Sequence, residues 1–416
     1  MIRKISDKVR SADGKRIIGN FLSLSVLNIF SLLLPLLTLP YVLRTIGFEL
    51  YGVTIMAMTL INYFTAITDF SFKITATRDV SINRASINKL SLIYSKVAST
   101  QALLLVLSIT IITLIVYLNP GFRINYHIFF IAILFLVGYT IFPDWFFLGM
   151  ERMKYITILN VIIKTLSAVL IFIFIKEKND YWLYPLFQSV GFLVCGLVGQ
   201  FILIYNFKLR LRWIGLKKIR ITLHDNYPIF INQFFPSLYN NTSTFLLGLM
   251  TSNFSVGLYD SLRKIIDIGI MGINTFSKVF FPFLSRKTDS FGVYRNLMMV
   301  IGVIFSILPI VFSNFVFLYL NIKSNDSFYI LSILSLGVLF ITLYDIFGVN
   351  YFIIHNKDKV VMNNTIISSL IGLVLAFPLI KFFGIYGAAI NLTFCRALMG
   401  IGLFRKYLIN RTYLDG

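Results

Sequence analysis

The sequence has little charge, few cysteines and few histidines. Only 13% of its 416 residues are Asp, Glu, Lys or Arg, whereas a soluble globular domain carries about 25%. This shortage of charge excludes a water-soluble fold for the chain. The two cysteines, Cys195 and Cys395, lie far apart, and the three histidines lack the spacing of metal ligands. We therefore expect no metal site and no cofactor.

Apolar residues make up 57% of the chain. They form stretches that are each close to the roughly 20 residues needed to cross about 30 Å of hydrocarbon as a helix. The pattern predicts an all-α integral membrane protein with about twelve transmembrane helices. Six are expected over 17–39, 51–68, 92–118, 126–148, 155–175 and 182–205, and six over 227–250, 256–281, 293–320, 328–354, 360–380 and 385–404.

The positions of Lys and Arg predict the orientation of these helices. With the boundaries above, 26 of the 38 basic residues lie on the side of both termini and six lie opposite. Short loops rich in Lys and Arg stay cytoplasmic, so we expect both termini to be cytoplasmic. The net charge of +21 is spread over separate loops without a nucleic-acid-binding motif. It favours contact with anionic inner-membrane lipids and no nucleic acid.

The longest basic loop lies halfway along the chain and divides the predicted helices into two lobes. An even number of helices per repeat makes the lobes parallel, related by an axis along the membrane normal. A transporter of this kind binds its cargo between the lobes. We expect a cytoplasmic N-terminal segment (1–16), an N-lobe (17–206), a basic cytoplasmic linker (207–225), a C-lobe (226–404) and a cytoplasmic tail (405–416).

Polar residues inside the predicted helices recur at helical spacing, which indicates a water-filled path. A polar group that faces hydrocarbon costs roughly several kcal/mol unless it is paired or wet. The clearest polar face is on 256–281, followed by that on 227–250, with a weaker one in the first lobe. The candidate path residues on these faces are Gln233, Asn240, Arg263, Lys264, Asp267, Lys278 and Asp69.

A structural role remains open for the helix over 256–281. Asp260 with Lys264, and Arg263 with Asp267, are spaced to pair within one helix. Lys278 lies near the predicted cytoplasmic end, where its long side chain can reach the headgroups. Arg263 is the strongest single candidate for contact with cargo.

Two further cations, Lys164 and Arg396, lie near the middle of their predicted helices. Each either contacts cargo or pairs with an acid such as Asp144 or Asp345 for assembly. An excess of Arg and Lys favours an anionic cargo, because guanidinium and ammonium groups pair with phosphate in a poorly screening medium. A lipid-linked oligosaccharide fits, since a diphosphate joins its sugars to a polyprenyl tail.

Several stretches resemble the Wzx-type O-antigen flippases. They are LLLPLLTLPYVLRTIG (32–47) followed by Tyr51-Gly52, KITATRD (73–79) and PDWFFLGMERMK (143–154). In the second half, Gly257-Leu258-Tyr259 with Arg263-Lys264, and then Phe281-Pro282, are similar to further stretches of that family. The resemblance extends over essentially the whole chain.

This resemblance implies membership of the superfamily of multidrug, oligosaccharidyl-lipid and polysaccharide exporters, with two six-helix bundles in a V. It implies alternating access and transport of undecaprenyl-diphosphate-linked O-units from the cytoplasmic to the periplasmic face of a bacterial inner membrane. It also implies no enzymatic turnover, and association with other polysaccharide-assembly membrane proteins. Arg44, Arg78 and Arg263 would fall where the family places basic residues near the cavity or its mouths.

Two other functions compete with the flippase. A cation-coupled multidrug exporter of the same superfamily is disfavoured by the basic excess, although Asp69 and Asp267 are able to host a proton or sodium ion. A membrane-embedded O-antigen polymerase or ligase needs a substantial periplasmic loop, and the predicted external loops hold about a dozen residues or fewer. An enzyme is therefore the weaker alternative.

Overall fold

The computed structural model describes residues 12–323 and 327–412, and this part of the chain contains helices and no strand. The predicted all-α fold is confirmed. The predicted terminal segments 1–16 and 405–416 lie partly outside the described residues. In the first half the elements are α2 (Ala12–Asp69), α3 (Phe72–Ile82), α4 (Ile87–Leu118), α5 (Pro120–Ile124), α6 (Tyr126–Ile141), α7 (Asp144–Gly149), α8 (Met153–Phe174), η1 (Lys178–Trp182) and α9 (Leu183–Tyr205).

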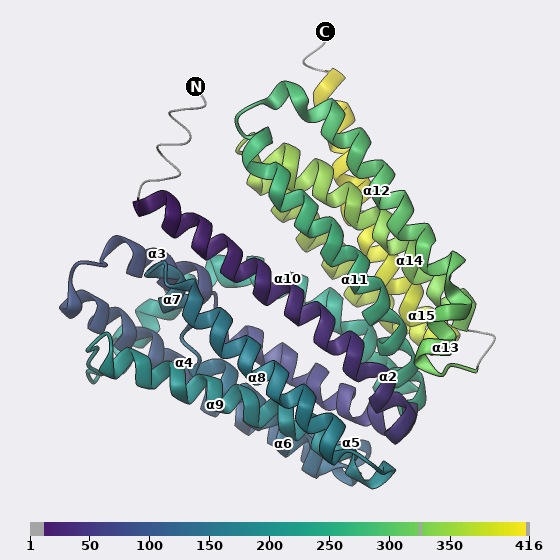
Figure 1. Ribbon diagram of the computed structural model, residues 1–416, viewed down its shortest axis with the longest axis horizontal. Coiled ribbons are helices and arrows are strands. Elements are labelled where there is room, and N and C mark those ends of the chain that lie inside the picture. Colours follow the sequence, from purple (N-terminus) through teal and green to yellow (C-terminus); the bar gives the residue numbers. More distant parts are fainter. Residues whose placement is uncertain (1–11, 324–326, 413–416) are drawn as a thin grey trace. The chain divides into compact units, whose positions relative to one another are not determined.

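The described second half of the chain is also built of helices (Figure 1). Its elements are α10 (Leu216–Met250), α11 (Asn253–Leu284), η2 (Thr288–Ser290), α12 (Phe291–Val311), α13 (Ser313–Leu320), α14 (Ser327–Leu343), the π-helix η3 (Tyr344–Ile353) and α15 (Asp358–Thr412).

Eight segments of the described chain are long and apolar enough to cross a membrane. Two of them lie in α2 and α15, and each of these helices covers two of the predicted spans. The helix continues across a glycine with non-helical dihedrals, which is Gly47 in α2 and Gly384 in α15. The predicted spans 227–250 and 256–281 correspond to α10 and α11, which are not among the eight and which carry many polar residues. The predicted count of about twelve helices stays a prediction.

The described residues form two units, each held together by its own contacts. The first contains the chain up to Thr45 and Leu60–Gln233, and the second contains Ile46–Thr59 and the chain from Phe234 onward. Within α2, the boundary between the two units lies between Thr45 and Ile46, beside Gly47. Gly47 has a φ of 80°, which suits glycine and interrupts the helical path of α2. α10 begins at Leu216, inside the segment predicted as a linker, and the predicted lobe boundaries stay a prediction.

In the first unit α6 packs against α4 and α9, α8 packs against α9, and α3 packs against α7 (Figure 1). A Cβ added at Gly138 of α6 would overlap the backbone of α9 at Leu193. Small residues of this kind let helix backbones approach closely where lipid supplies no hydrophobic drive. Around α7, a buried cluster of Phe142, Trp145 and Phe146 fixes the start of this short helix.

In the second unit α14 packs against α11, α12 and α15, and η3 packs against α11 and α15. The segment Ile46–Thr59 belongs to this unit through a close backbone approach to the start of α11. A Cβ added at Gly52 would overlap the carbonyl oxygen of Asn253, and one added at Gly257 would overlap that of Phe48. The pair of glycines therefore allows Tyr51 to reach the polar face of α11.

We predict that Gly52→Ala and Gly257→Ala each lower the stability of the protein by about 1–3 kcal/mol, because the added methyl group forces two backbones apart. The control is Gly292→Ala in α12, where a Cβ has nothing within 4 Å. Thermal unfolding in detergent should place both variants below the wild type and Gly292→Ala level with it. Equal melting temperatures for all three variants would contradict the close approach.

Candidate functional site

The second unit brings three charged side chains together, which we call the arginine cluster: Arg263, Asp267 and Arg396. Asp267 lies one turn beyond Arg263 on α11, and its Oδ2 is 3.4 Å from Arg263 Nε. Its other oxygen, Oδ1, is 3.2 Å from Nη2 of Arg396, which α15 contributes from 129 residues away in sequence. The cluster therefore holds two guanidinium groups and one carboxylate, an excess of one positive charge.

Both arginines of the cluster are held firmly. Arg263 Nη1 donates a 2.7 Å hydrogen bond to the carbonyl oxygen of Asn240 on α10. The side chain of Arg396 is only 4% exposed, and a Cβ at Gly337 of α14 would come within 3.1 Å of its Cδ and Nη1. Glycine at 337 thus leaves the room that this buried guanidinium needs. Nε and Nη1 of Arg396 are buried without a hydrogen-bond acceptor among the described residues.

Lys264 lies on the same helix but is neutralised by an acid of its own. Its Nζ is 3.1 Å from Oδ2 of Asp260 and donates to the hydroxyl of Tyr51 at 2.5 Å. The Tyr51 hydroxyl in turn donates to Asp260 at 2.7 Å. The two pairs predicted within this helix, Asp260 with Lys264 and Arg263 with Asp267, are both confirmed. One lysine balances one acid here, unlike the arginine cluster.

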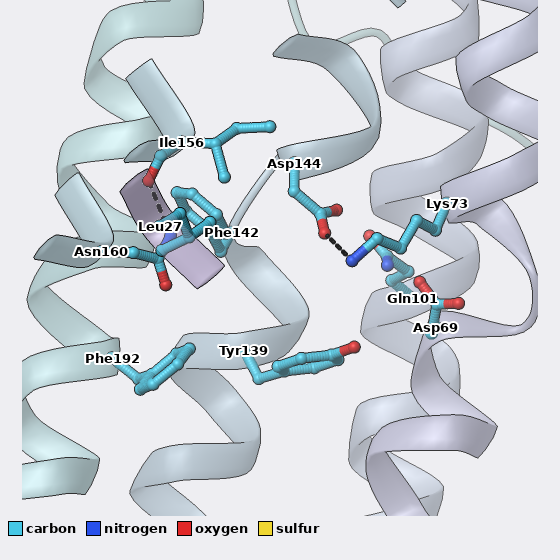
Figure 2. A pocket seen from close by; sticks show the side chains of 10 residues that line it. All are labelled: Leu27, Asp69, Lys73, Gln101, Tyr139, Phe142, Asp144, Ile156, Asn160 and Phe192. Atoms are coloured by element: carbon cyan, nitrogen blue, oxygen red, sulfur yellow. Dashed lines mark hydrogen bonds and ion pairs between the residues drawn. The ribbon is translucent and has the colours of Figure 1, made fainter. Parts of the chain in front are cut away.

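The first unit contains a cavity of roughly 170 Å³ that is lined by both polar and apolar side chains. Figure 2 shows Lys73 and Asp144 pointing toward each other, with Asp69 beside them, and Lys73 Nζ is 2.8 Å from Asp144 Oδ2. Asp69 lines the same cavity, and the ion pair joins Lys73 to Asp144. The remaining lining residues are Gln101, Tyr139, Asn160, Leu27, Phe142, Ile156 and Phe192.

A sharp turn in the chain produces this arrangement. α2 ends at Asp69, and Phe70 and Ser71 have left-handed dihedrals with φ of 41° and 64°. α3 then starts at Phe72, so Asp69 and Lys73 line the same cavity from either side of the turn. Asp144 is the first residue of α7, where a carboxylate is favoured by the helix dipole.

Of the two mid-helix cations, Arg396 does pair with an acid, though with neither of the two acids named as examples, and Lys164 contacts a hydroxyl group. Lys164 donates a 2.8 Å hydrogen bond to the hydroxyl of Ser31 and forms no ion pair with Asp144, because Asp144 faces Lys73. Arg396 pairs with Asp267 and not with Asp345, which lies buried in η3.

Four further predicted path residues lie outside both the arginine cluster and the cavity of the first unit. Arg44 on α2, Arg78 on α3, Gln233 on α10 and Lys278 near the end of α11 are exposed. Nε of Arg78 lies 3.6 Å from Oδ1 of Asp79. Their role in a transport path stays a prediction.

Sequence reasoning overlooked the partners that complete these sites. Tyr51, Gln101, Tyr139 and Asn160 are single polar residues within apolar stretches, without a helical repeat to mark them. Lys73 follows Asp69 by four residues, the spacing of neighbours on one helical face. That spacing was the only signal for the cavity of the first unit.

Comparison with known families and proteins gives consistent results. A family model described as "Polysaccharide biosynthesis protein" matches residues 17–288. A protein of Escherichia coli (strain K12) named "Putative O-antigen transporter" is 27% identical over 387 residues, covering 90% of this chain and 92% of its own. A protein of Shigella dysenteriae with the same name is 23% identical over 390 residues, covering 91% of this chain and 97% of its own.

Solved structures share the fold at low sequence identity. An inward-facing multidrug resistance MATE family transporter of the MOP superfamily has a TM-score of 0.63 and 12% identity, covering 92% of this chain and 95% of its own. The lipid II flippase MurJ, in an inward closed conformation, has a TM-score of 0.66 and 14% identity, covering 92% and 87%. The predicted MATE-like helical fold is confirmed, and the relatives, like these structures, are named as transporters or flippases rather than enzymes.

We predict that Lys73 and Asp144 are energetically coupled. In a double-mutant cycle of Lys73→Gln and Asp144→Asn, the double variant should lose less free energy of unfolding than the two single variants together. The coupling should be about 1 kcal/mol, since the Lys73 side chain is 52% exposed and screened. The control cycle combines Lys73→Gln with Asp180→Asn. The carboxylate of Asp180 accepts hydrogen bonds from the backbone N–H groups of Lys176 and Glu177, so the losses of unfolding free energy in this cycle should add. Additivity in both cycles would rule out the pair.

Proposed function

Because residues 17–288 match its family model, this chain belongs to the family of polysaccharide biosynthesis proteins, and on that premise we propose that it is a flippase. Its cargo is a lipid-linked sugar, the precursor of an O-antigen or another polysaccharide. Two relatives named as O-antigen transporters and the fold shared with a lipid II flippase support this assignment. The observation that carries it is the arginine cluster with its excess positive charge.

The chemistry of the cluster favours a diphosphate. Guanidinium groups bind phosphate oxygens through paired, charge-assisted hydrogen bonds. The two arginines share the single carboxylate of Asp267, which leaves one positive charge that an anionic cargo neutralises. Undecaprenyl diphosphate linked to an oligosaccharide supplies that anion together with hydroxyl groups that cannot cross hydrocarbon unaided. Drug cations would meet repulsion at the same place.

The proposed transport cycle is alternating access. The sugar and diphosphate enter from the cytoplasmic face and leave at the periplasmic face, while the polyprenyl tail stays in the lipid. MATE family transporters of the same fold are known in inward-facing and outward-facing conformations, which supports this cycle. We further propose twelve membrane helices in two six-helix lobes, with both termini in the cytoplasm and the protein in the bacterial inner membrane.

A second candidate is cation-coupled multidrug export. The cavity of the first unit favours it, because Asp69 and Asp144 outnumber Lys73 there. An acidic cavity suits a coupling cation as well as a drug, so the same observation is compatible with a cation-driven flippase.

Deletion of the gene in its native host tests the flippase directly. We expect long-chain surface polysaccharide to disappear and single lipid-linked units to accumulate on the cytoplasmic face of the inner membrane. Complementation by Arg263→Ala should fail although the variant reaches the membrane, and Arg263→Lys should restore part of the polysaccharide because it keeps the charge.

Other outcomes of this deletion point to the competing functions. Single units on the periplasmic face would favour a polymerase or ligase, since the cargo has then already crossed. Unchanged polysaccharide together with raised drug sensitivity would favour the multidrug exporter.

A further inference from the structure

Asp267 occupies the place in the arginine cluster where an anionic cargo would bind. We propose that its carboxylate is an internal substitute for the cargo phosphate, which holds Arg263 and Arg396 together until a diphosphate displaces it. This inference rests on the proposed function, and it assigns Asp267 the role of a built-in competitor.

The ion pairs of Asp267 are long, and each arginine receives one oxygen. The separations of 3.2 and 3.4 Å exceed the roughly 2.7–2.9 Å of a charge-assisted N–H···O bond. Neither guanidinium is engaged by two oxygens of one carboxylate, which is the strongest geometry available to it. A cargo phosphate that binds both arginines at shorter distances therefore competes with Asp267 on favourable terms.

The two guanidinium groups of the cluster also carry more N–H donors than the carboxylate of Asp267 has hydrogen bonds with. Nε and Nη1 of Arg396 are buried and lack an acceptor within the described ranges. Buried polar groups in native proteins nearly always have a hydrogen-bond partner, so such donors call for an explanation. A diphosphate presents several terminal oxygens, and its two or more negative charges match the two arginines.

Exposure distinguishes the fixed members of the cluster from the movable one. The side chain of Arg396 is 4% exposed and that of Arg263 is 15% exposed, whereas that of Asp267 is 41% exposed. Arg263 is also tied to the carbonyl oxygen of Asn240. The carboxylate is thus the most exposed group of the cluster, and we assign it the movement while the two guanidinium groups stay in place.

An internal competitor serves transport in two ways. It neutralises part of the buried charge when no cargo is bound, which limits the cost of an empty site. It also weakens cargo binding by its own return to the arginines, so that the diphosphate is released after translocation and does not remain trapped. Anions with a single negative charge displace it poorly, which favours a diphosphate over smaller anions.

The test is binding of undecaprenyl diphosphate, without sugar, to the purified full chain in lipid nanodiscs. Asp267→Asn should tighten binding by about tenfold, and Asp267→Ser should have the same effect through a smaller side chain, with thermal unfolding used to check that each variant folds. Arg396→Gln should weaken binding by about tenfold or more. Asp289→Asn removes the same charge from an exposed position of the second unit and should leave binding at the wild-type value.

The outcomes separate this inference from the proposed function. If both Asp267 variants weaken binding or leave it unchanged while Arg396→Gln weakens it, Asp267 positions the arginines and the competitor role is wrong, whereas the proposed cargo site stands. If Arg396→Gln binds as tightly as the wild type, the arginine cluster is not the diphosphate site, and the proposal for cargo recognition fails with it.

Discussion

The cost of an unpaired charge away from water governs the arrangement of polar residues in this protein. Removing one partner of a buried ion pair costs about 3–5 kcal/mol, since the remaining charge is left without compensation. Arg396 is almost fully buried in the second unit and has Asp267 as its counter-charge. That requirement draws α15 and α11 to one point and places Arg263 beside them. The site therefore arises from the same balance of charges that keeps the helices assembled.

The two units differ in the sign of their uncompensated charge. The arginine cluster has one more cation than anion, whereas the cavity around Lys73 has one more carboxylate than ammonium. A phosphate is attracted to the first and a cation to the second. A flippase driven by a cation gradient needs both kinds of site, and the proposed function assigns one to each unit.

The local features of the fold could be predicted from the sequence, and its long-range contacts could not. Helical spacing along α11 correctly paired Arg263 with Asp267 and Asp260 with Lys264, because residues four apart share a helical face. The partner of Arg396 lies 129 residues away, and no periodicity carries that information. The sequence suggests Asp144 only as one example of an acid for Lys164 or Arg396, and the turn after Asp69 brings Lys73 to it instead.

The most direct test of the central claim is transport by the purified protein in liposomes. A short fluorescent sugar on undecaprenyl diphosphate, placed in one leaflet, should cross to the other with the wild-type chain and cross far more slowly with Arg396→Gln. Equal rates in protein-free liposomes and in liposomes with the wild-type chain would contradict the flippase. Equal rates for the wild type and Arg396→Gln would contradict the role of the arginine cluster.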